Sequence, residues 1–172
     1  VFGTSRFEAE AAEHGWPRPV VYAHEELPAH FRRYERTLGW NTAINKRQFA
    51  IPVDTFAWPA TYRYPDVTYR DHVTFTRGDV AFELHHARGE TDDATWTFCP
   101  ELRILHPGDL FIWAVLNAGN PQKVQRFASD WAVALREMAG CGAEIMLCGH
   151  GLPIFGADRV RQALLDTADV LD

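Results

Sequence analysis

Three glycine-containing turns constrain the fold of this 172-residue chain more than any other feature. They read HARGETDD (86–93), HPGDLF (106–111) and CGHGLP (148–153), and each one ends a run of residues that favours a β-strand. Glycine allows the backbone to turn tightly at the end of a strand, so that several such turns can direct side chains into one cleft. The pattern therefore predicts a protein in which three strand ends lie near one another.

Each of these turns carries one side chain that can bind a metal ion, namely Glu90, Asp109 and His150. Carboxylates and imidazole are suitable ligands for zinc, iron or manganese. The segment between Glu90 and Asp109 is long enough for a strand pair, and the segment between Asp109 and His150 is long enough for a helix and a strand. The alternative is that the three side chains only cap turns or accept backbone hydrogen bonds.

The remaining sequence predicts strands that alternate with helices, which is typical of a layered α/β protein. Helices are expected at 4–14, 24–40, 121–139 and 157–172, with a polar connection at 41–48 and an irregular, aromatic-rich loop at 49–66. Strands are expected within 17–24, 73–86, 95–106 and 143–148, the second of these forming a hairpin around Gly78.

Alternation in the second arm of that hairpin predicts one buried and one exposed face. Phe82, Leu84 and His86 are expected on the buried face, whereas Glu83 and His85 are expected on the exposed face. A buried His86 would be hydrogen-bonded, and it could orient a neighbouring ligand.

Composition and charge indicate which classes of binding partner and which cellular compartment to expect. The net charge is −6 and no basic tract is present, so nucleic acid and anionic membranes are disfavoured as partners and a small-molecule substrate is expected. The longest apolar run, 110–116, is far shorter than the roughly 20 residues of a membrane span. An odd number of cysteines, three, favours a reducing, cytoplasmic location over a disulfide framework.

In this order, the three turns resemble the second half of the metallo-β-lactamase superfamily. Members usually have His-x-Pro-Gly-His-Thr, then a Gly-Asp strand end, then Gly-His, and these motifs match 86–91, 108–109 and 149–150. The run GDLFIWAVLNAGNPQKVQRF (108–127), together with GETDD, is similar to the alkyl-sulfatase-like branch. In that branch a glutamate stands where many relatives have the third-motif histidine.

The resemblance implies an α/β fold of the αββα sandwich kind, with residues 1–172 as one domain that lacks its N-terminal strands. It implies that Glu90 binds one metal ion, that Asp109 bridges two ions and so serves catalysis, and that His150 binds the second ion. Two zinc ions are expected in the full-length parent protein, with manganese or iron as alternatives. The implied reaction is attack by a metal-bound hydroxide on an ester-type bond, such as an alkyl sulfate ester.

The chain departs from the family pattern at several positions. Arg88 replaces the proline of the third motif. Relatives often have a histidine shortly after the Asp-Asp pair, whereas residues 93–96 read DATW here. No His-x-His-x-Asp-His motif is present, and in the family this motif supplies most of the ligands of one ion. Three donors are too few for a closed pair of sites, so metal is expected chiefly in the longer parent protein.

The segment after the Asp109 turn offers groups that could bind a substrate anion. Asn117, Asn120 and Arg126 are polar or cationic, and arginine can hold a pair of sulfate oxygens near the beginning of a helix. The alternative is a solvated loop that leads into a helix.

Two other functions stay open at this stage. The first is hydrolysis of a carboxyl ester, thioester or lactone by the same kind of site, for which Arg126 would not be needed. The second is a metal-free, non-catalytic fragment with a structural role, including assembly into a homo-oligomer. The acids Asp92 and Asp93 could steady the ligand-bearing turn or simply form it, and Cys148 is expected to be a buried small residue.

Overall fold

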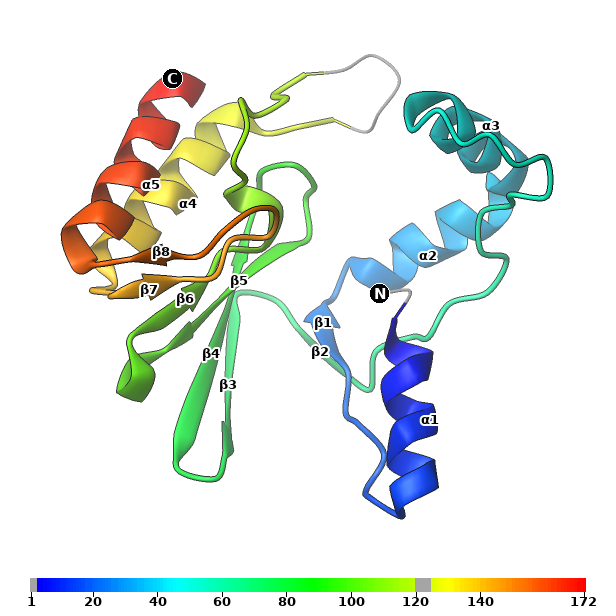
Figure 1. The fold of residues 1–172 in the computed structure, drawn as a ribbon, viewed down its shortest axis with the longest axis horizontal. Helices are drawn as coiled ribbons and strands as arrows, with labels where there is room; N and C mark the ends of the chain where they lie inside the picture. The colour runs from blue at the N-terminus through cyan, green and yellow to red at the C-terminus, as the bar shows by residue number, and fades with distance from the viewer. Residues whose placement is uncertain (1–2, 120–124) are drawn as a thin grey trace. The chain divides into compact units, whose positions relative to one another are not determined.

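The computed structural model describes residues 3–119 and 125–172, and the chain divides into two compact units at 68/69. The first unit contains three helices and the paired strands β1 and β2 (Figure 1). Its elements are α1 (Thr4–His14), β1 (Tyr22–His24), α2 (Leu27–Arg36), α3 (Leu38–Gln48) and the first two residues of β2 (Val67–Tyr69). The organisation of 1–172 as a single domain stays a prediction.

The helix predicted at 24–40 is in fact two helices, and the polar connection predicted at 41–48 is wrong. The break lies at Thr37, which has left the helical conformation, and α3 continues to Gln48. The polar side chains of α3 bond along the helix, because Asn45 Nδ2 donates to Asn41 O at 2.8 Å and Asn41 Nδ2 donates to Thr37 Oγ1 at 3.0 Å. Polar residues satisfied in this way do not interrupt a helix.

The segment 49–66 contains no helix or strand, as predicted, and its aromatic side chains form part of the core of the first unit. Tyr62 stacks on Phe31 of α2 with ring centroids 4.6 Å apart, and Tyr64 meets the same ring edge-on. Phe31 is therefore almost fully buried, and the loop covers one side of α2.

The second unit is a six-stranded sheet in the order β3-β4-β5-β6-β7-β8. Among the described strands of this sheet, β6 and β7 pair in parallel, and the other neighbours are antiparallel. The strands are β3 (His72–Arg77), β4 (Val80–Ala87), β5 (Ala94–Cys99), β6 (Ile104–His106), β7 (Ile145–Met146) and β8 (Ile154–Phe155). The hairpin and the second strand pair are as predicted, whereas the strand expected at 143–148 is reduced to two residues.

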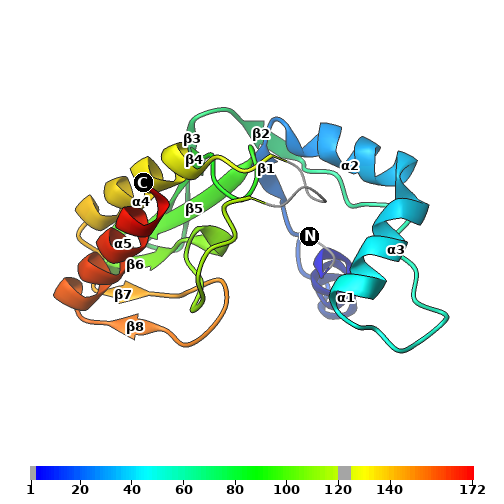
Figure 2. The same ribbon diagram turned by 90° about the horizontal axis from the view of Figure 1, so that it is seen from above.

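Two helices, α4 (Ala128–Gly140) and α5 (Ala157–Leu171), lie side by side on one face of this sheet (Figures 1 and 2). The register places Phe98, Leu105, Met146 and Ile154 in one row across four strands, and all four are buried. The unit is thus a sheet with a helical layer, and its core lies between them.

The helix predicted at 121–139 begins later, at Ala128. Trp131, Leu135 and Met138 are buried on one face of it, as their spacing predicts. Phe127 is the N-cap residue rather than a helical residue. No described helix has both the length and the apolar character needed to span a bilayer.

The two-faced burial predicted for the second arm of the hairpin is wrong, because every residue of β4 from Val80 to His86 is partly buried. His85 is not exposed, since its ring stacks on that of Trp96 with centroids 4.1 Å apart and an interplanar angle of 11°. Side chains of the neighbouring strands partly cover both faces of β4, because His72 and Trp96 stack on His85, and Phe75 stacks on Phe82.

Candidate metal centre

Asp109 and His150, which lie on separate turns, are neighbours in the structure. Asp109 lies in the short 3₁₀ helix η2 (Gly108–Leu110) after β6, and His150 follows β7. His150 Nε2 and Asp109 Oδ1 are 3.4 Å apart, and both side chains are more than half exposed. An imidazole nitrogen and a carboxylate oxygen that are close together and accessible can share one divalent cation.

The two turns can approach so closely because Gly149 has no side chain. A Cβ atom at Gly149 would lie 2.4 Å from the carbonyl oxygen of Gly108 and 2.7 Å from Asp109 Oδ1. The backbone after Asp109 also bonds to the backbone of His150. Ile112 and His150 form a parallel bridge, and Trp113 N donates to His150 O at 3.2 Å. The glycine predicted to permit a tight turn thus also permits this contact between turns.

Glu90, the third predicted ligand, forms an ion pair with Arg126. Arg126 Nη2 lies 2.8 Å from Glu90 Oε1, and the Arg126 side chain is only 9% exposed. Within residues 3–119 and 125–172, the ligand atoms of Glu90, Asp109 and His150 do not all lie within 4.8 Å of one another. The structure therefore brings two of the three predicted ligands together, and metal binding by all three stays a prediction.

Trp131 of α4 connects the Glu90 turn to the Asp109 turn. Its Nε1 donates to Leu110 O at 2.8 Å. A Cβ atom at Gly89 would lie 2.5 Å from Leu110 Cδ2 and 3.0 Å from the Trp131 ring. The indole is 1% exposed, so it is a buried support on which both ligand-bearing turns rest.

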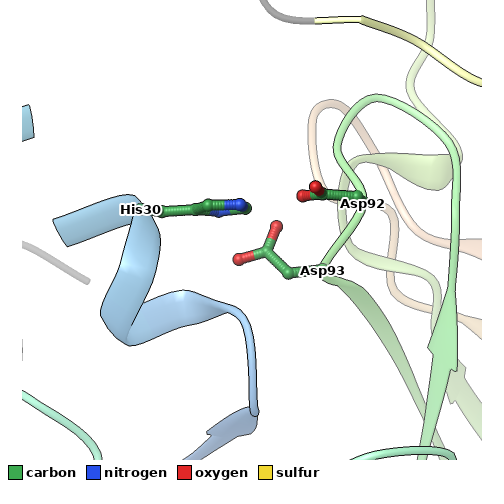
Figure 3. A group of neighbouring side chains, drawn as sticks. All are labelled: His30, Asp92 and Asp93. Carbon is green, nitrogen blue, oxygen red and sulfur yellow. The ribbon is translucent and has the colours of Figure 1, made fainter. Parts of the chain in front are cut away.

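The acids Asp92 and Asp93 lie on the turn that leads into β5 (Figure 3). His86 Nε2 donates to the Asp92 carbonyl oxygen at 2.8 Å, which ties the end of β4 to this turn. His86 is partly rather than fully buried. The hydrogen bond predicted for His86 is therefore present, and its role in orienting a metal ligand stays a prediction. The third side chain in Figure 3, His30, belongs to α2 of the first unit.

The three candidate substrate residues differ in their surroundings. Asn117 is exposed, and its Oδ1 accepts a hydrogen bond from Gly119 N at 3.2 Å. Arg126 is nearly buried beside Glu90. Asn120 lies outside the described residues. Substrate binding by these three residues stays a prediction.

Trp113 is a residue of the site that sequence reasoning did not identify. Its ring fills the space beside Gly151, where a Cβ atom would lie 2.0 Å from Trp113 Cδ1, and its Nε1 donates to Leu152 O at 2.7 Å. The ring therefore fixes the loop that carries His150. A tryptophan four residues after Asp109 was the available signal, but it lies within the apolar run 110–116, where nothing in the sequence distinguishes it from a core residue.

Cys148 is partly buried, which agrees in part with its predicted structural role. Burial raises the pKa of its thiol above the ordinary value, although a hydrogen bond with Trp113 acts in the opposite direction. A thiol whose pKa is raised stays protonated near neutral pH, so Cys148 is a poor nucleophile.

No protein-family model matches the chain. A curated relative, the linear primary-alkylsulfatase of Pseudomonas sp. (strain ATCC 19151), is 23% identical over 114 residues, which are 65% of this chain and 22% of the relative. Among solved structures, the stereoselective inverting sec-alkylsulfatase Pisa1 from Pseudomonas sp. superposes with a TM-score of 0.72 at 20% identity. That match covers 95% of this chain and 29% of Pisa1.

A second solved structure, a metallo-beta-lactamase from Pontibacter korlensis, has a TM-score of 0.54 at 20% identity, over 94% of this chain and 61% of that protein. The chain thus spans less than a third of the length of the two alkylsulfatases that it resembles.

Proposed function

Because the chain has the metallo-β-lactamase fold and is related to the alkylsulfatases of that superfamily, we propose that its parent protein is a metal-dependent hydrolase of an ester-type bond. The observation that carries this proposal is the approach of His150 Nε2 to within 3.4 Å of Asp109 Oδ1. Two side chains from distant turns are held at a short distance, and glycine makes the approach possible.

The chemistry of the side chains fits divalent zinc. Asp109 and His150 would hold an ion between them, with Asp109 able to bridge to a second ion and Glu90 able to serve that second position. A bound zinc ion supplies Lewis acidity and lowers the pKa of a coordinated water to near 7. The chain itself positions the ligands, since Trp131 supports both turns and Trp113 fixes the loop of His150. Further ligands would come from the rest of the parent protein.

An alkyl sulfate ester is the substrate class that we favour, because the two alkylsulfatases have that class in their names. Asn117, Asn120 and Arg126 are the proposed substrate-side groups, since they follow the Asp109 turn directly. Hydrolysis of a carboxyl ester, thioester or lactone is the second candidate, because it uses the same metal ligands. Initial rates on a panel of sulfate, phosphate and carboxylate esters separate these two candidates.

Asp109→Asn is expected to remove at least one equivalent of zinc from the full-length parent protein and to lower its zinc affinity by about 100-fold or more. Loss of an outer hydrogen-bond partner of a ligand already costs about 10–100-fold in metal affinity, and loss of a bridging carboxylate should cost more. Zinc content by elemental analysis and zinc affinity by competition with a chelator measure the effect.

The matched control is Asp130→Asn, because Asp130 is an equally exposed aspartate of the second unit whose nearest cation is Arg88 at 3.9 Å. This control should keep its zinc. Unchanged zinc content in Asp109→Asn would mean that the ligand assignment is wrong and would favour a metal-free, structural role for the chain.

A further inference from the structure

We infer that Arg126 positions Glu90 as a metal ligand, in addition to any contact that Arg126 makes with a substrate. The inference rests on the proposed function and assigns a role within the same site. It starts from the 2.8 Å ion pair between Arg126 Nη2 and Glu90 Oε1. In this arrangement one carboxylate oxygen of Glu90 is occupied by the guanidinium, and Oε2 is left for a cation.

Burial of the guanidinium makes loss of the ion pair costly. The Arg126 side chain is 9% exposed and the Glu90 side chain is 36% exposed. A charge removed from water in this way requires a partner of opposite charge, and a hydrogen bond between two ionised groups is stronger than one between neutral groups. Within the described part of the chain, Arg126 Nε is buried and has no hydrogen-bond partner. The ion pair with Glu90 therefore holds this guanidinium in place.

The backbone holds the two residues side by side. Phe127 N donates to Gly89 O at 3.0 Å, so the residue after Arg126 is bonded to the residue before Glu90. The Arg88 guanidinium lies over the Phe127 ring, 5.1 Å from its centroid. On the other side, Gly89 is packed so tightly against Leu110 and Trp131 that a Cβ atom would not fit. The Glu90 turn is thus clamped between the segment before α4 and the Asp109 turn.

Charge and orientation have opposite effects on the binding of a cation. The positive charge of Arg126 weakens the attraction of Glu90 for a metal ion, whereas the clamp holds the carboxylate in one orientation before the ion arrives. Ligands that are already ordered lose less conformational entropy on binding. The pair is fixed by backbone contacts as well as by charge, so we expect orientation to dominate and Arg126 to increase zinc affinity.

The test is a double-mutant cycle on the zinc affinity of the full-length parent protein, measured by competition with a chromophoric chelator. Arg126→Gln and Glu90→Gln should each weaken zinc binding by about 10–100-fold. The double variant should bind no more weakly than Glu90→Gln alone, because Arg126 acts through Glu90. Arg126→Lys should recover part of the loss, since lysine keeps the charge without the planar fork.

The matched control is Arg136→Gln, which breaks another arginine–carboxylate pair of the second unit, with Arg136 Nη2 at 2.8 Å from Asp169 Oδ1. This change should leave the zinc affinity unaltered. If Arg126→Gln does not fold, as judged by circular dichroism, Arg126→Lys takes its place in the cycle and must show the same lack of additivity.

Several results would overturn the inference. They are unchanged or tighter zinc binding in Arg126→Gln, additive losses in the double variant, and unchanged affinity in Glu90→Gln. If Glu90→Gln is unaffected while Asp109→Asn loses zinc, the positioning role is wrong but the proposed function stands. If the wild-type protein binds no zinc, both are wrong.

Discussion

Trp131→Ala is expected to lower the free energy of unfolding of the second unit by about 3–5 kcal/mol, the usual cost of removing a buried tryptophan ring. The ring is 1% exposed and packs against Gly89, and its Nε1 donates a buried hydrogen bond to Leu110 O. Because both ligand-bearing turns rest on this indole, zinc binding should weaken as well. Urea unfolding followed by circular dichroism measures the loss of stability.

Two further variants separate packing from the hydrogen bond. Trp131→Phe keeps most of the ring but loses the bond from Nε1, so it should cost less than Trp131→Ala. Val133→Ala, on the same helix but at a position that is 55% exposed, should change stability by less than about 0.5 kcal/mol. Equal effects of Trp131→Ala and Val133→Ala would show that the indole does not support the two turns.

Gly149→Ala is expected to destabilise the second unit by about 1–3 kcal/mol through overpacking and to abolish zinc binding at the Asp109–His150 pair. The added Cβ would lie 2.4 Å from Gly108 O and 2.7 Å from Asp109 Oδ1. Since the first of these atoms belongs to the backbone, a turn must move to relieve the overlap. The turn that moves carries either Asp109 or His150, so the two ligands should separate. Zinc affinity and thermal unfolding measure the two effects.

Gly140→Ala provides the comparison, because a Cβ atom at that position would have no neighbour within 4 Å. It should leave zinc affinity unchanged and stability unchanged or slightly higher, since alanine favours a helix more than glycine does. A Gly149→Ala protein that keeps wild-type zinc affinity would show that the close approach of the two turns is not needed for the site.

Much of the fold could be predicted from the sequence, since the periods of its apolar residues match the elements that form. The spacing of Trp131, Leu135 and Met138 predicts the buried face of α4, and Gly78 marks the hairpin turn, where its φ is +58°. The glycine-flanked turns correctly indicated that Asp109 and His150 could meet. The first two features are recorded in local patterns, whereas the third was expected from glycines that end separate strands.

Features that depend on contacts between distant residues could not be predicted in this way. Helix α3 was missed because its asparagine side chains bond within the helix, so polar composition did not mark a loop. Partial burial of His85 depends on Trp96 of the neighbouring strand. The pairing of Glu90 with Arg126 depends on a backbone bond between segments far apart in the sequence, and no local pattern records it.

The proposed function requires that Asp109 and His150 bind the same metal ion. Diffraction data collected at the zinc absorption edge from crystals of the full-length parent protein test this directly. We expect an anomalous peak within about 2.0–2.2 Å of both an Asp109 carboxylate oxygen and a His150 ring nitrogen. A fully occupied zinc ion that contacts neither side chain would contradict it.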